Sequence, residues 1–498
     1  MKALKKFIPC LALLLGISCV AEREQENSFY LNQIARISIS TPQQIFFSEN
    51  LSQALPVDVR YFDESNRPLF TNQNIPFELF LTDSLIEAPS LDLSRPGTYR
   101  LRAAFPTRER TFSNDVEIQV VGPDYIQEIR LDFSDETRNS FAVADNNTMD
   151  FRVRVFGPEG EITGLEDQIL RNLELQVGEQ VSSSLQNIRI RETGSLKVKA
   201  RIFGVESNEL QIESREDIVY PVKEMPIIFH VFSNGPNISE AQMANEISKV
   251  NAAFANTIRT SFRSNVNAVN GYFRFRLADR APDGSMLQTV GYNRIEVASD
   301  FSDDSPEYLQ TKFDEMWDPN RYINVFIESI GFAAGFAYLP TLSEGVIPGL
   351  QVNSNPDPVI NYPYSISLDY RFAIEQSNPN PHVLAHEMGH YLGLYHTFQN
   401  CGPGDYVDDT KPHSIDNLSG NAVFNNNRRS CLGENFISTN FMDYVVNVDH
   451  FTFDQRERMN AVYDFGLFVP RAENQTSRIS SFKKGTLDRS IEPIICNF

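Results

Sequence analysis

The segment HEMGHYLGLYH, residues 386–396, constrains this chain more than any other. His386 and His390 lie four residues apart, so their imidazoles leave one face of a helix about one turn apart. That spacing suits two ligands of a single Zn²⁺ ion, which binds neutral imidazole readily. Glu387 stands beside the first ligand, where its carboxylate can reach a water molecule on the metal and act as a general base rather than as a ligand. The segment therefore predicts a helix that carries two ligands of a metal site.

The residues that follow supply a third ligand. Gly393 comes three residues after His390, and glycine can adopt the positive φ that lets a chain turn sharply. The turn brings His396 round to the metal, and three protein ligands with an open fourth position are typical of catalytic zinc. The alternative is a helix whose histidines are ordinary surface or core groups, but the full pattern should arise by accident in on the order of one chain of this length in ten thousand. The four other histidines are expected to be ordinary polar or strand residues: His230, His382, His413 and His450.

The pattern of apolar residues indicates a mixed α/β domain around this segment, from residue 217 to residue 470. The continuous apolar run MPIIFHVF at 225–232 is expected of a strand that is covered on both faces. Further strands are expected at 271–278, 322–330 and 335–340. Capping signals predict three helix starts: Ser239 with Gln242, Asn380 with Pro381, and Thr452 with Gln455.

The region before this domain contains one unit used twice. Short segments with alternating apolar and polar residues recur at offsets of 92 to 97 residues: 34–39 and 126–133, 59–69 and 153–163, 97–103 and 194–200, 113–118 and 207–212. Units of this size, with short strands and frequent turns, are typical of β-sandwiches. We expect two modules, 30–122 and 123–216, that resemble bacterial Ig-like modules. They carry no motif for chemistry, so a spacer role is expected; binding of carbohydrate or substrate is the alternative.

The N-terminus has the pattern of a targeting signal. Three lysines within the first six residues precede the apolar stretch 7–17, which is too short to span a bilayer, and small residues surround Cys19. The stretch resembles a bacterial lipoprotein signal, which implies a signal peptide at 1–18, an acylated Cys19 and a polar tether at 19–29. Cleavage after Ala21 and soluble secretion is the alternative, and a lipid mass on Cys19 would distinguish the two. Either way we expect an extracytoplasmic protein: an outer-membrane or cell-surface lipoprotein, or a secreted one.

Composition excludes some partners. The 44 Lys and Arg residues against 65 Asp and Glu residues give a formal charge of −21, which argues against nucleic acid or an anionic membrane surface as the main partner. Beyond the N-terminus no apolar run is long enough to span a bilayer, so membrane attachment is expected only through a lipid anchor. Five cysteines in 498 residues are too few for a disulfide-built scaffold.

The motifs downstream of the histidines complete a resemblance. HEMGHYLGLYH is the signature of the metzincin zinc endopeptidases, which also have a methionine turn downstream; here Met442 lies within STNFMDYV, forty-six residues after His396. Together with the cysteine just after the motif, GDYVDDT and NFMDY, the segment resembles the pappalysin (cytophagalysin) family. The resemblance covers about 217–470 and leaves 471–498 as a tail. The expected fold is multidomain: two all-β Ig-like sandwich modules followed by an α/β metzincin-like domain.

This resemblance implies roles for individual residues. It implies that His386, His390 and His396 bind zinc, that Glu387 is the general base, and that Met442 lies under the metal as an apolar floor. Tyr444 would either stabilise the oxyanion of the tetrahedral intermediate or be a core tyrosine, and only geometry decides.

The resemblance also implies structural elements of the lower lobe. Cys401 and Cys431 resemble two of four family cysteines and are expected to form a disulfide, while Cys496 is left over. Since no cysteine lies between Cys19 and Cys401, a cysteine-switch latency mechanism has no candidate there. The acidic loop GDYVDDT resembles one that holds Ca²⁺ in family members, with Asp405, Asp408 and Thr410 as candidate ligands; a solvated acidic loop is the alternative.

The sequence thus predicts a secreted or envelope-anchored zinc metalloendopeptidase. Its expected substrates are extended protein or peptide segments, docked by strand addition beside FAYLP at 336–340, the segment that corresponds to the upper-rim edge strand of metzincins. The resemblance implies acidic residues just after the methionine turn, which favour basic side chains in the substrate. Val445–Val448 stand there instead, so we expect cleavage beside less basic, more apolar side chains. The alternatives are a catalytically silent adhesion or binding protein with a relic protease domain, and a zinc hydrolase that acts on a non-peptide amide. The physiological substrate and the oligomeric state stay open.

Overall fold

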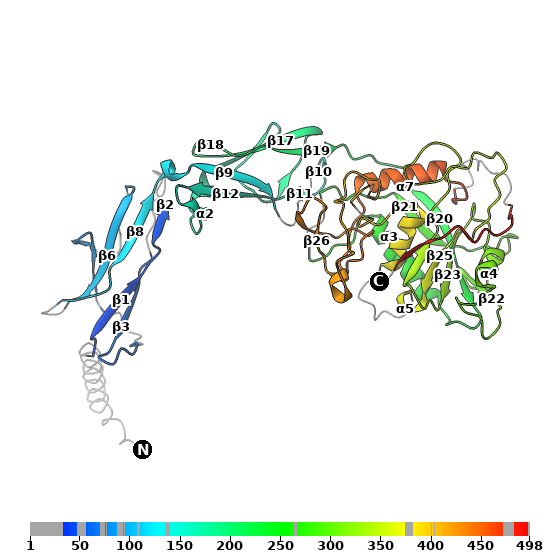
Figure 1. Cartoon of the computed structure of the whole chain (residues 1–498), viewed down its shortest axis with the longest axis horizontal. Coiled ribbons are helices and arrows are strands. Elements are labelled where there is room, and N and C mark those ends of the chain that lie inside the picture. Colours follow the sequence, from blue (N-terminus) through cyan, green and yellow to red (C-terminus); the bar gives the residue numbers. More distant parts are fainter. Residues whose placement is uncertain are drawn as a thin grey trace, which may run out of the picture. The chain divides into compact units, whose positions relative to one another are not determined.

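The computed structural model describes residues 33–46, 56–69, 75, 77–86, 93, 95–106, 110–134, 140–262, 266–373, 382–399, 401–402, 404–471 and 483–496 (Figure 1). The predicted signal peptide, Cys19, and the helix start at Asn380 and Pro381 lie outside these residues. Within them no helix is both long and apolar enough to cross a membrane.

The chain forms two compact units. One contains residues up to Arg130 together with 153–174 and 200–208, and the other contains 131–152, 175–199 and everything from Glu209 onward. The division passes through the predicted module 123–216, so the predicted boundaries of the modules stay predictions.

The first predicted module consists of two sheets around one apolar core. The strands are β1 (Arg36–Ser40), β2 (Gln44–Phe46), β3 (Asp58–Phe62), β4 (Glu78–Leu81), β5 (Ser84–Ile86), β6 (Gly97–Phe105), β7 (Thr111–Phe112) and β8 (Val116–Val121). β1 and β3 form a two-stranded antiparallel sheet, and the other sheet has the order β2-β8-β6-β4-β5 with β7 beside β6. Ile37, Leu101 and Ile118 are completely or almost completely buried in the shared core. Alternating apolar residues thus build a sandwich, as the sequence predicts.

The second predicted module repeats this topology. It contains η1 (Pro123–Tyr125), β9 (Glu128–Phe133), β10 (Phe141–Val143), β11 (Thr148–Met149), β12 (Phe151–Gly157), β13 (Gly160–Glu161), α2 (Glu166–Ile169), η2 (Leu170–Asn172), β14 (Leu173–Val177), β15 (Gln180–Ser182), β16 (Ile188–Arg189), β17 (Gly194–Ile202), β18 (Val205–Glu206) and β19 (Leu210–Arg215). β2 runs parallel to β8 and β8 antiparallel to β6; equally, β10 runs parallel to β19 and β19 antiparallel to β17. The strand pairs β6–β8 and β17–β19 contain two pairs of segments that recur in the sequence.

The repeat extends to individual hydrogen bonds. Ser113 Oγ accepts from the backbone N–H of Ala103 at 2.9 Å and donates to the carbonyl of Asn114. Ser207 Oγ makes the same pair of bonds, to Ala200 N at 2.9 Å and to the carbonyl of the asparagine that follows it. The repeated Ser-Asn dipeptide therefore holds the same turn in both modules.

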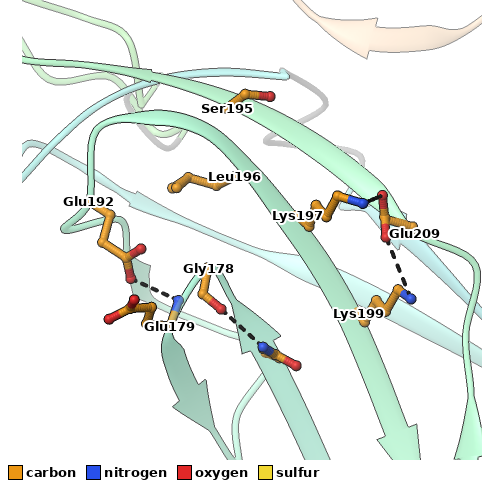
Figure 2. A pocket seen from close by; sticks show the side chains of 9 residues that line it. Gly178, Glu179, Glu192, Ser195, Leu196, Lys197, Lys199 and Glu209 are labelled. Atoms are coloured by element: carbon orange, nitrogen blue, oxygen red, sulfur yellow. Dashed lines mark hydrogen bonds and ion pairs between the residues drawn. The ribbon is translucent and has the colours of Figure 1, made fainter.

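A polar pocket lies on the second module (Figure 2). Three of its charged side chains form ion pairs with one another: Glu209 faces Lys197 at 3.0 Å and Lys199 at 3.5 Å. Glu192 Oε1 accepts from the backbone N–H of Glu179 at 3.0 Å. These contacts point to no ligand, and the spacer role stays a prediction.

The remaining elements surround a mostly parallel sheet with the order β21-β20-β23-β25-β24-β28, with β22 beside β20 (Figure 1). The strands are β20 (Lys223–Phe232), β21 (Phe273–Leu277), β22 (Tyr292–Ile295), β23 (Ile323–Glu328), β24 (Gly335–Ala337), β25 (Ile366–Asp369) and β28 (Ile494–Cys496), and a separate hairpin joins β26 (Asn427–Arg429) to β27 (Asn435–Ile437). β20, β23 and β25 run parallel, whereas β24 is antiparallel to β25. β23 and β25 are buried at every residue, as continuous apolar runs covered on both faces require.

The helices are α3 (Glu240–Phe254), α4 (Tyr308–Glu315), α5 (Tyr370–Ala373), α6 (Val383–Tyr391) and α7 (Phe453–Phe465), with the 3₁₀ turn η3 (Gly420–Phe424). The predicted capping boxes are present: Ser239 with Gln242 begins α3, and Thr452 with Gln455 begins α7. α6 packs against α3 and against β24 and β25. The sheet and α3 thus fix the position of the helix that carries HEMGH.

The C-terminal end of the chain differs from the sequence expectation. The segment FAYLP was expected to be the free edge strand, but β24 is covered by β28, which pairs antiparallel with it. Before β28, residues 483–488 run beside Ile360 and Asn361, and Gly485 N donates to the carbonyl of Ile360 at 2.7 Å. Described residues of the predicted tail are therefore part of the seven-stranded sheet. The sequence did not predict this strand, because a three-residue apolar strand carries too little periodicity to be recognised.

Candidate metal centre

Helix α6 is buried along its whole length, and two glycines shape it. A Cβ on Gly389 would lie 2.4 Å from Met442 Sδ, so the absence of a side chain lets Met442 pack directly against the helix. Gly393 has φ of 88°, and a Cβ there would lie 2.7 Å from Val462 Cγ2. Its carbonyl accepts from Arg458 Nε at 2.7 Å. The chain therefore turns at Gly393, as expected, and α7 holds the turn in place.

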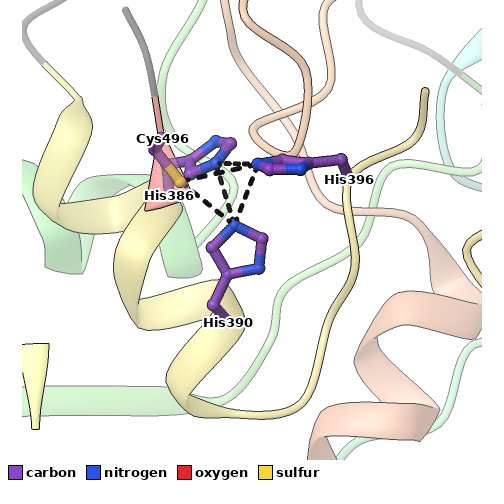
Figure 3. A group of neighbouring side chains, drawn as sticks. All are labelled: His386, His390, His396 and Cys496. Carbon is purple, nitrogen blue, oxygen red and sulfur yellow. Dashed lines mark hydrogen bonds between the residues drawn. The ribbon is translucent and has the colours of Figure 1, made fainter. Parts of the chain in front are cut away.

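The turn brings three imidazoles together (Figure 3). The Nε2 atoms of His386, His390 and His396 lie 3.1 Å from one another in all three pairs. All three side chains are buried. Two of the rings come from one face of α6 and the third from the segment after Gly393, which is the arrangement that the spacing predicts.

Backbone carbonyls orient two of these rings. His386 Nδ1 lies 2.6 Å from the carbonyl oxygen of Phe441, and His390 Nδ1 lies 2.8 Å from that of Leu394. A proton on Nδ1 leaves the Nε2 lone pair free for a metal, and such partners are what ligating histidines usually have. Burial lowers the pKa of His390 to about 4, and burial is also the main reason why the pKa values of His386 and His396 lie well below the usual range. The rings are therefore neutral near pH 7, the form that binds metals.

Glu387 lies at the same centre and is completely buried. Neither carboxylate oxygen has a nitrogen or oxygen partner among the described residues. Burial raises the pKa of Glu387 well above its usual value. A Cβ on Gly335 would lie 2.7 Å from Glu387 Oε1, so β24 makes room for the carboxylate by having no side chain there. A buried carboxylate without a nitrogen or oxygen partner is costly, which indicates a site built for a group that the protein binds.

The methionine turn contributes two further residues. Met442 is completely buried, and its carbonyl accepts from Thr397 N at 3.1 Å, just after the third histidine. The ring of Tyr444 lies 5.0 Å from that of His396, between centroids, and its hydroxyl donates to the carbonyl of Ile495 at 3.3 Å. The hydroxyl is thus directed at a peptide carbonyl next to the three imidazoles.

Cys496, which sequence reasoning left without a role, is the fourth side chain of the centre (Figure 3). Its Sγ lies 3.4 Å from His390 Nε2 and 3.5 Å from His396 Nε2, and the side chain is buried. The thiol also faces the Glu387 carboxylate. No local motif could have revealed it, since it lies one hundred residues from His396.

These distances match tetrahedral zinc coordination. Zinc–nitrogen bonds of about 2.0–2.1 Å place tetrahedral nitrogens about 3.3 Å apart, and a zinc–sulfur bond of about 2.3 Å places sulfur about 3.6 Å from each nitrogen. The three nitrogens and the sulfur all lie within 4.8 Å of one another. The residues present therefore fit a zinc ion.

A disulfide between Cys401 and Cys431 stabilises the region after the third histidine. Their Cα atoms are 5.6 Å apart, and thirty residues separate them in sequence. Closing a loop of this length stabilises a fold by about 3–4 kcal/mol in the chain-entropy model.

The calcium candidates are only partly brought together. Asp405 is buried and accepts from Thr410 Oγ1 at 2.8 Å, whereas the side chain of Asp408 is exposed. The buried neighbour Asp409 instead accepts from Thr452 Oγ1 at 2.6 Å and from Asp454 N, and so ties the loop to the start of α7. Burial raises the pKa of Asp405 to about 6.

Comparisons with known proteins find relatives of the region that contains this site. Residues 308–464 match the family model described as Pregnancy-associated plasma protein-A. An extracellular metalloprotease of Neurospora crassa is 27% identical over 268 residues, which cover 47% of this chain and 88% of that protein. One of Podospora anserina is 30% identical over 209 residues, covering 39% of this chain and 65% of that protein. Among solved structures, mature mirolysin of Tannerella forsythia in complex with a cleaved peptide is 21% identical; the match covers 52% of this chain and 95% of that one, with a TM-score of 0.37.

The family match and the curated relatives define a metalloendopeptidase. Within that class, residues 308–464, which contain the histidine motif and the methionine turn, are similar to the pappalysin family of metzincins.

Proposed function

We propose that this chain hydrolyses peptide bonds with one zinc ion held by His386, His390 and His396, and with Glu387 as the general base. The observation that carries the proposal is the equilateral arrangement of three buried imidazoles, two of them oriented by backbone carbonyls, beside a buried carboxylate that has no nitrogen or oxygen partner among the described residues. When bound, zinc supplies Lewis-acid chemistry: it polarises a water molecule and the scissile carbonyl.

The residues of the chain then have defined tasks. Glu387 accepts the proton of the attacking water and delivers it to the leaving amine nitrogen, so it acts first as a general base and then as a general acid. Tyr444 donates a hydrogen bond to the oxyanion that forms on the scissile carbonyl, as it does here to a peptide carbonyl. Met442 keeps the floor of the centre apolar.

Substrates of this site are extended protein or peptide segments. β25 pairs with one side of β24 and β28 covers the other side. A substrate strand paired in the place of β28 would bring a peptide carbonyl close to Tyr444. A less basic, more apolar side-chain preference is part of this proposal, since Val445 and Val448 are buried in the methionine-turn region. A cleavage profile dominated by Arg or Lys after the scissile bond would contradict it.

Removal of the metal tests the proposal. We expect casein digestion to be lost after dialysis against a chelator and restored by one equivalent of Zn²⁺, because the three histidines bind a single ion. The assay should use both wild type and Cys496→Ala, since Cys496 lies in the same centre. Stoichiometric zinc without cleavage in either chain would instead support a relic protease domain in an adhesion or binding protein.

We also propose an extracytoplasmic location, either secreted or attached by lipid on Cys19. The matched relatives are named extracellular metalloproteases, and the structure contains a disulfide, which persists outside the cytoplasm. The intact mass of the mature N-terminus distinguishes the two forms.

A structural Ca²⁺ ion in the 404–410 loop stays a proposal supported by the buried carboxylate of Asp405. We expect chelation of calcium in zinc-saturated protein to lower the melting temperature of the catalytic region. An unchanged melting temperature would remove calcium from the account.

A further inference from the structure

The last described strand of the chain occupies the position that an extended substrate would need. β28 pairs with β24 in antiparallel register, with Cys496 opposite Gly335 and Ile494 opposite Ala337. Ala334 N donates to the carbonyl of Cys496 at 2.9 Å, and Tyr444 donates to the carbonyl of Ile495. Backbone groups that would bind substrate by strand addition are therefore already bound to the protein's own C-terminal segment.

The side chains of this strand distinguish a binding role from core packing. Ile495 is 45% exposed, whereas Cys496 is completely buried among polar groups of the centre. A side chain that served only to fill the core would face apolar neighbours. Cys496 instead faces the Nε2 atoms of His390 and His396 and the carboxylate of Glu387, and its sulfur stands at the fourth corner of the tetrahedron described above.

We infer that residues 494–496 form a built-in inhibitor, in which Cys496 is the fourth ligand of the metal and β28 blocks the substrate edge of β24. The inference rests on the proposed zinc site. Four protein ligands are typical of structural, closed zinc sites, and three with an open position are typical of catalytic ones. With its C-terminal strand in place the chain is latent, and displacement or removal of that strand opens the fourth position.

The chemistry of this closure is a simple ligand exchange. When the sulfur binds the cation, the thiol would lose its proton to solvent, and one sulfur–metal bond would form as a water molecule leaves the fourth position. When the strand leaves, that bond would break, a water molecule would take the fourth position, and the thiolate would take up a proton again. No oxidation or reduction takes place, so no further reactant is needed.

The test uses the full chain with Co²⁺ in place of Zn²⁺. We expect wild type to show a thiolate-to-cobalt charge-transfer band in the near ultraviolet, and Cys496→Ser to lack it. Ile495→Ala, which changes the neighbouring exposed side chain of the same strand, should retain the band. In the zinc form, Cys496 should resist a thiol reagent until the metal is removed. A wild-type spectrum without the band, or a thiol that reacts equally with and without zinc, would overturn the inference.

Activity provides the second measurement. We expect Cys496→Ala to raise kcat/KM for a peptide substrate at least tenfold over wild type, and deletion of 491–498 to raise it further. Val181→Ala, which changes an exposed side chain of the second module, should stay near wild type. Equal, measurable activity of wild type and Cys496→Ala would refute the inhibitor and leave the proposed peptidase intact. If the cobalt band is present but no variant cleaves any peptide, the fourth ligand is supported and the proposed peptidase is wrong.

Discussion

Glu387→Gln is expected to lower kcat/KM for peptide hydrolysis by about a thousandfold, the middle of the range for loss of a general base, while the protein still binds one equivalent of zinc. Glutamine has nearly the same shape, so the packing against Gly335 is kept. It cannot accept a proton, however, so neither water activation nor protonation of the leaving amine is supported. The measurement is peptide cleavage with zinc content determined on the same sample, in the Cys496→Ala background where the centre is open.

A matched control is available in the same unit. Glu246 on α3 is also buried and is paired with Lys249, so Glu246→Gln removes a buried carboxylate away from the histidines. It should affect stability rather than turnover. If Glu387→Gln in the Cys496→Ala background retained activity within threefold of Cys496→Ala alone, Glu387 would not be the general base.

Asp443→Ala is expected to destabilise the catalytic region by about 3–5 kcal/mol, because it removes one partner of a buried ion pair and leaves the other charge uncompensated. Arg428 Nη2 lies 2.7 Å from Asp443 Oδ1, and His413 Nε2 lies 3.2 Å from Oδ2; all three side chains are at most 1% exposed. Asp443 follows Met442 directly, so we also expect weaker zinc retention. Urea unfolding of the full chain, monitored together with zinc release, measures both effects.

Exposure provides the control for this prediction. The Asp58–Arg60 pair has a similar distance of 2.8 Å but side chains that are 54% and 69% exposed. Asp58→Ala should therefore cost under about 1 kcal/mol. A cost for Asp443→Ala as small as that would show that Arg428 finds solvent or another partner once the carboxylate is gone.

The same ion pair sets a dependence on pH. Burial alone would raise the pKa of Asp443, but the hydrogen bonds and charges of His413 and Arg428 outweigh it and hold the pKa well below the usual range of an aspartate. A carboxyl whose pKa is depressed by folding stabilises the native state above its unfolded pKa, and this stabilisation is lost as the pH falls below about 4. Asp443→Ala should therefore flatten the loss of stability in that acidic range.

Local signals in the sequence were sufficient for much of this structure. The capping residues Ser239 and Thr452 begin α3 and α7 because the capping box is formed by residues three apart. His386, His390 and His396 meet because helix periodicity and one glycine turn place them within eleven residues. The repeat was visible because each Ser-Asn turn reuses the same short-range bonds.

Long-range pairing could not be predicted in the same way. Cys496 reaches the histidines only through the pairing of β28 with β24, which joins residues about 160 positions apart in the chain. The contact of Arg428 with Asp443 likewise depends on the fold of an irregular region. The sequence named Asp408 as a candidate ligand, but Asp408 is exposed and its neighbour Asp409 is buried. The two side chains are chemically identical, and only the hydrogen bond from Thr452, which reaches Asp409, distinguishes them.

β28 pairs with β24 of the same molecule, so the pairing does not weaken when the protein is diluted. A tethered strand is present at its docking edge at an effective concentration on the order of millimolar, however few molecules a compartment holds. A free peptide would have to compete with β28 at that effective concentration. A single cut in the chain before β28 would let the strand dissociate and diffuse away. If β28 is the inhibitor proposed above, cleavage of the chain before β28, rather than the abundance of substrate, would control the enzyme.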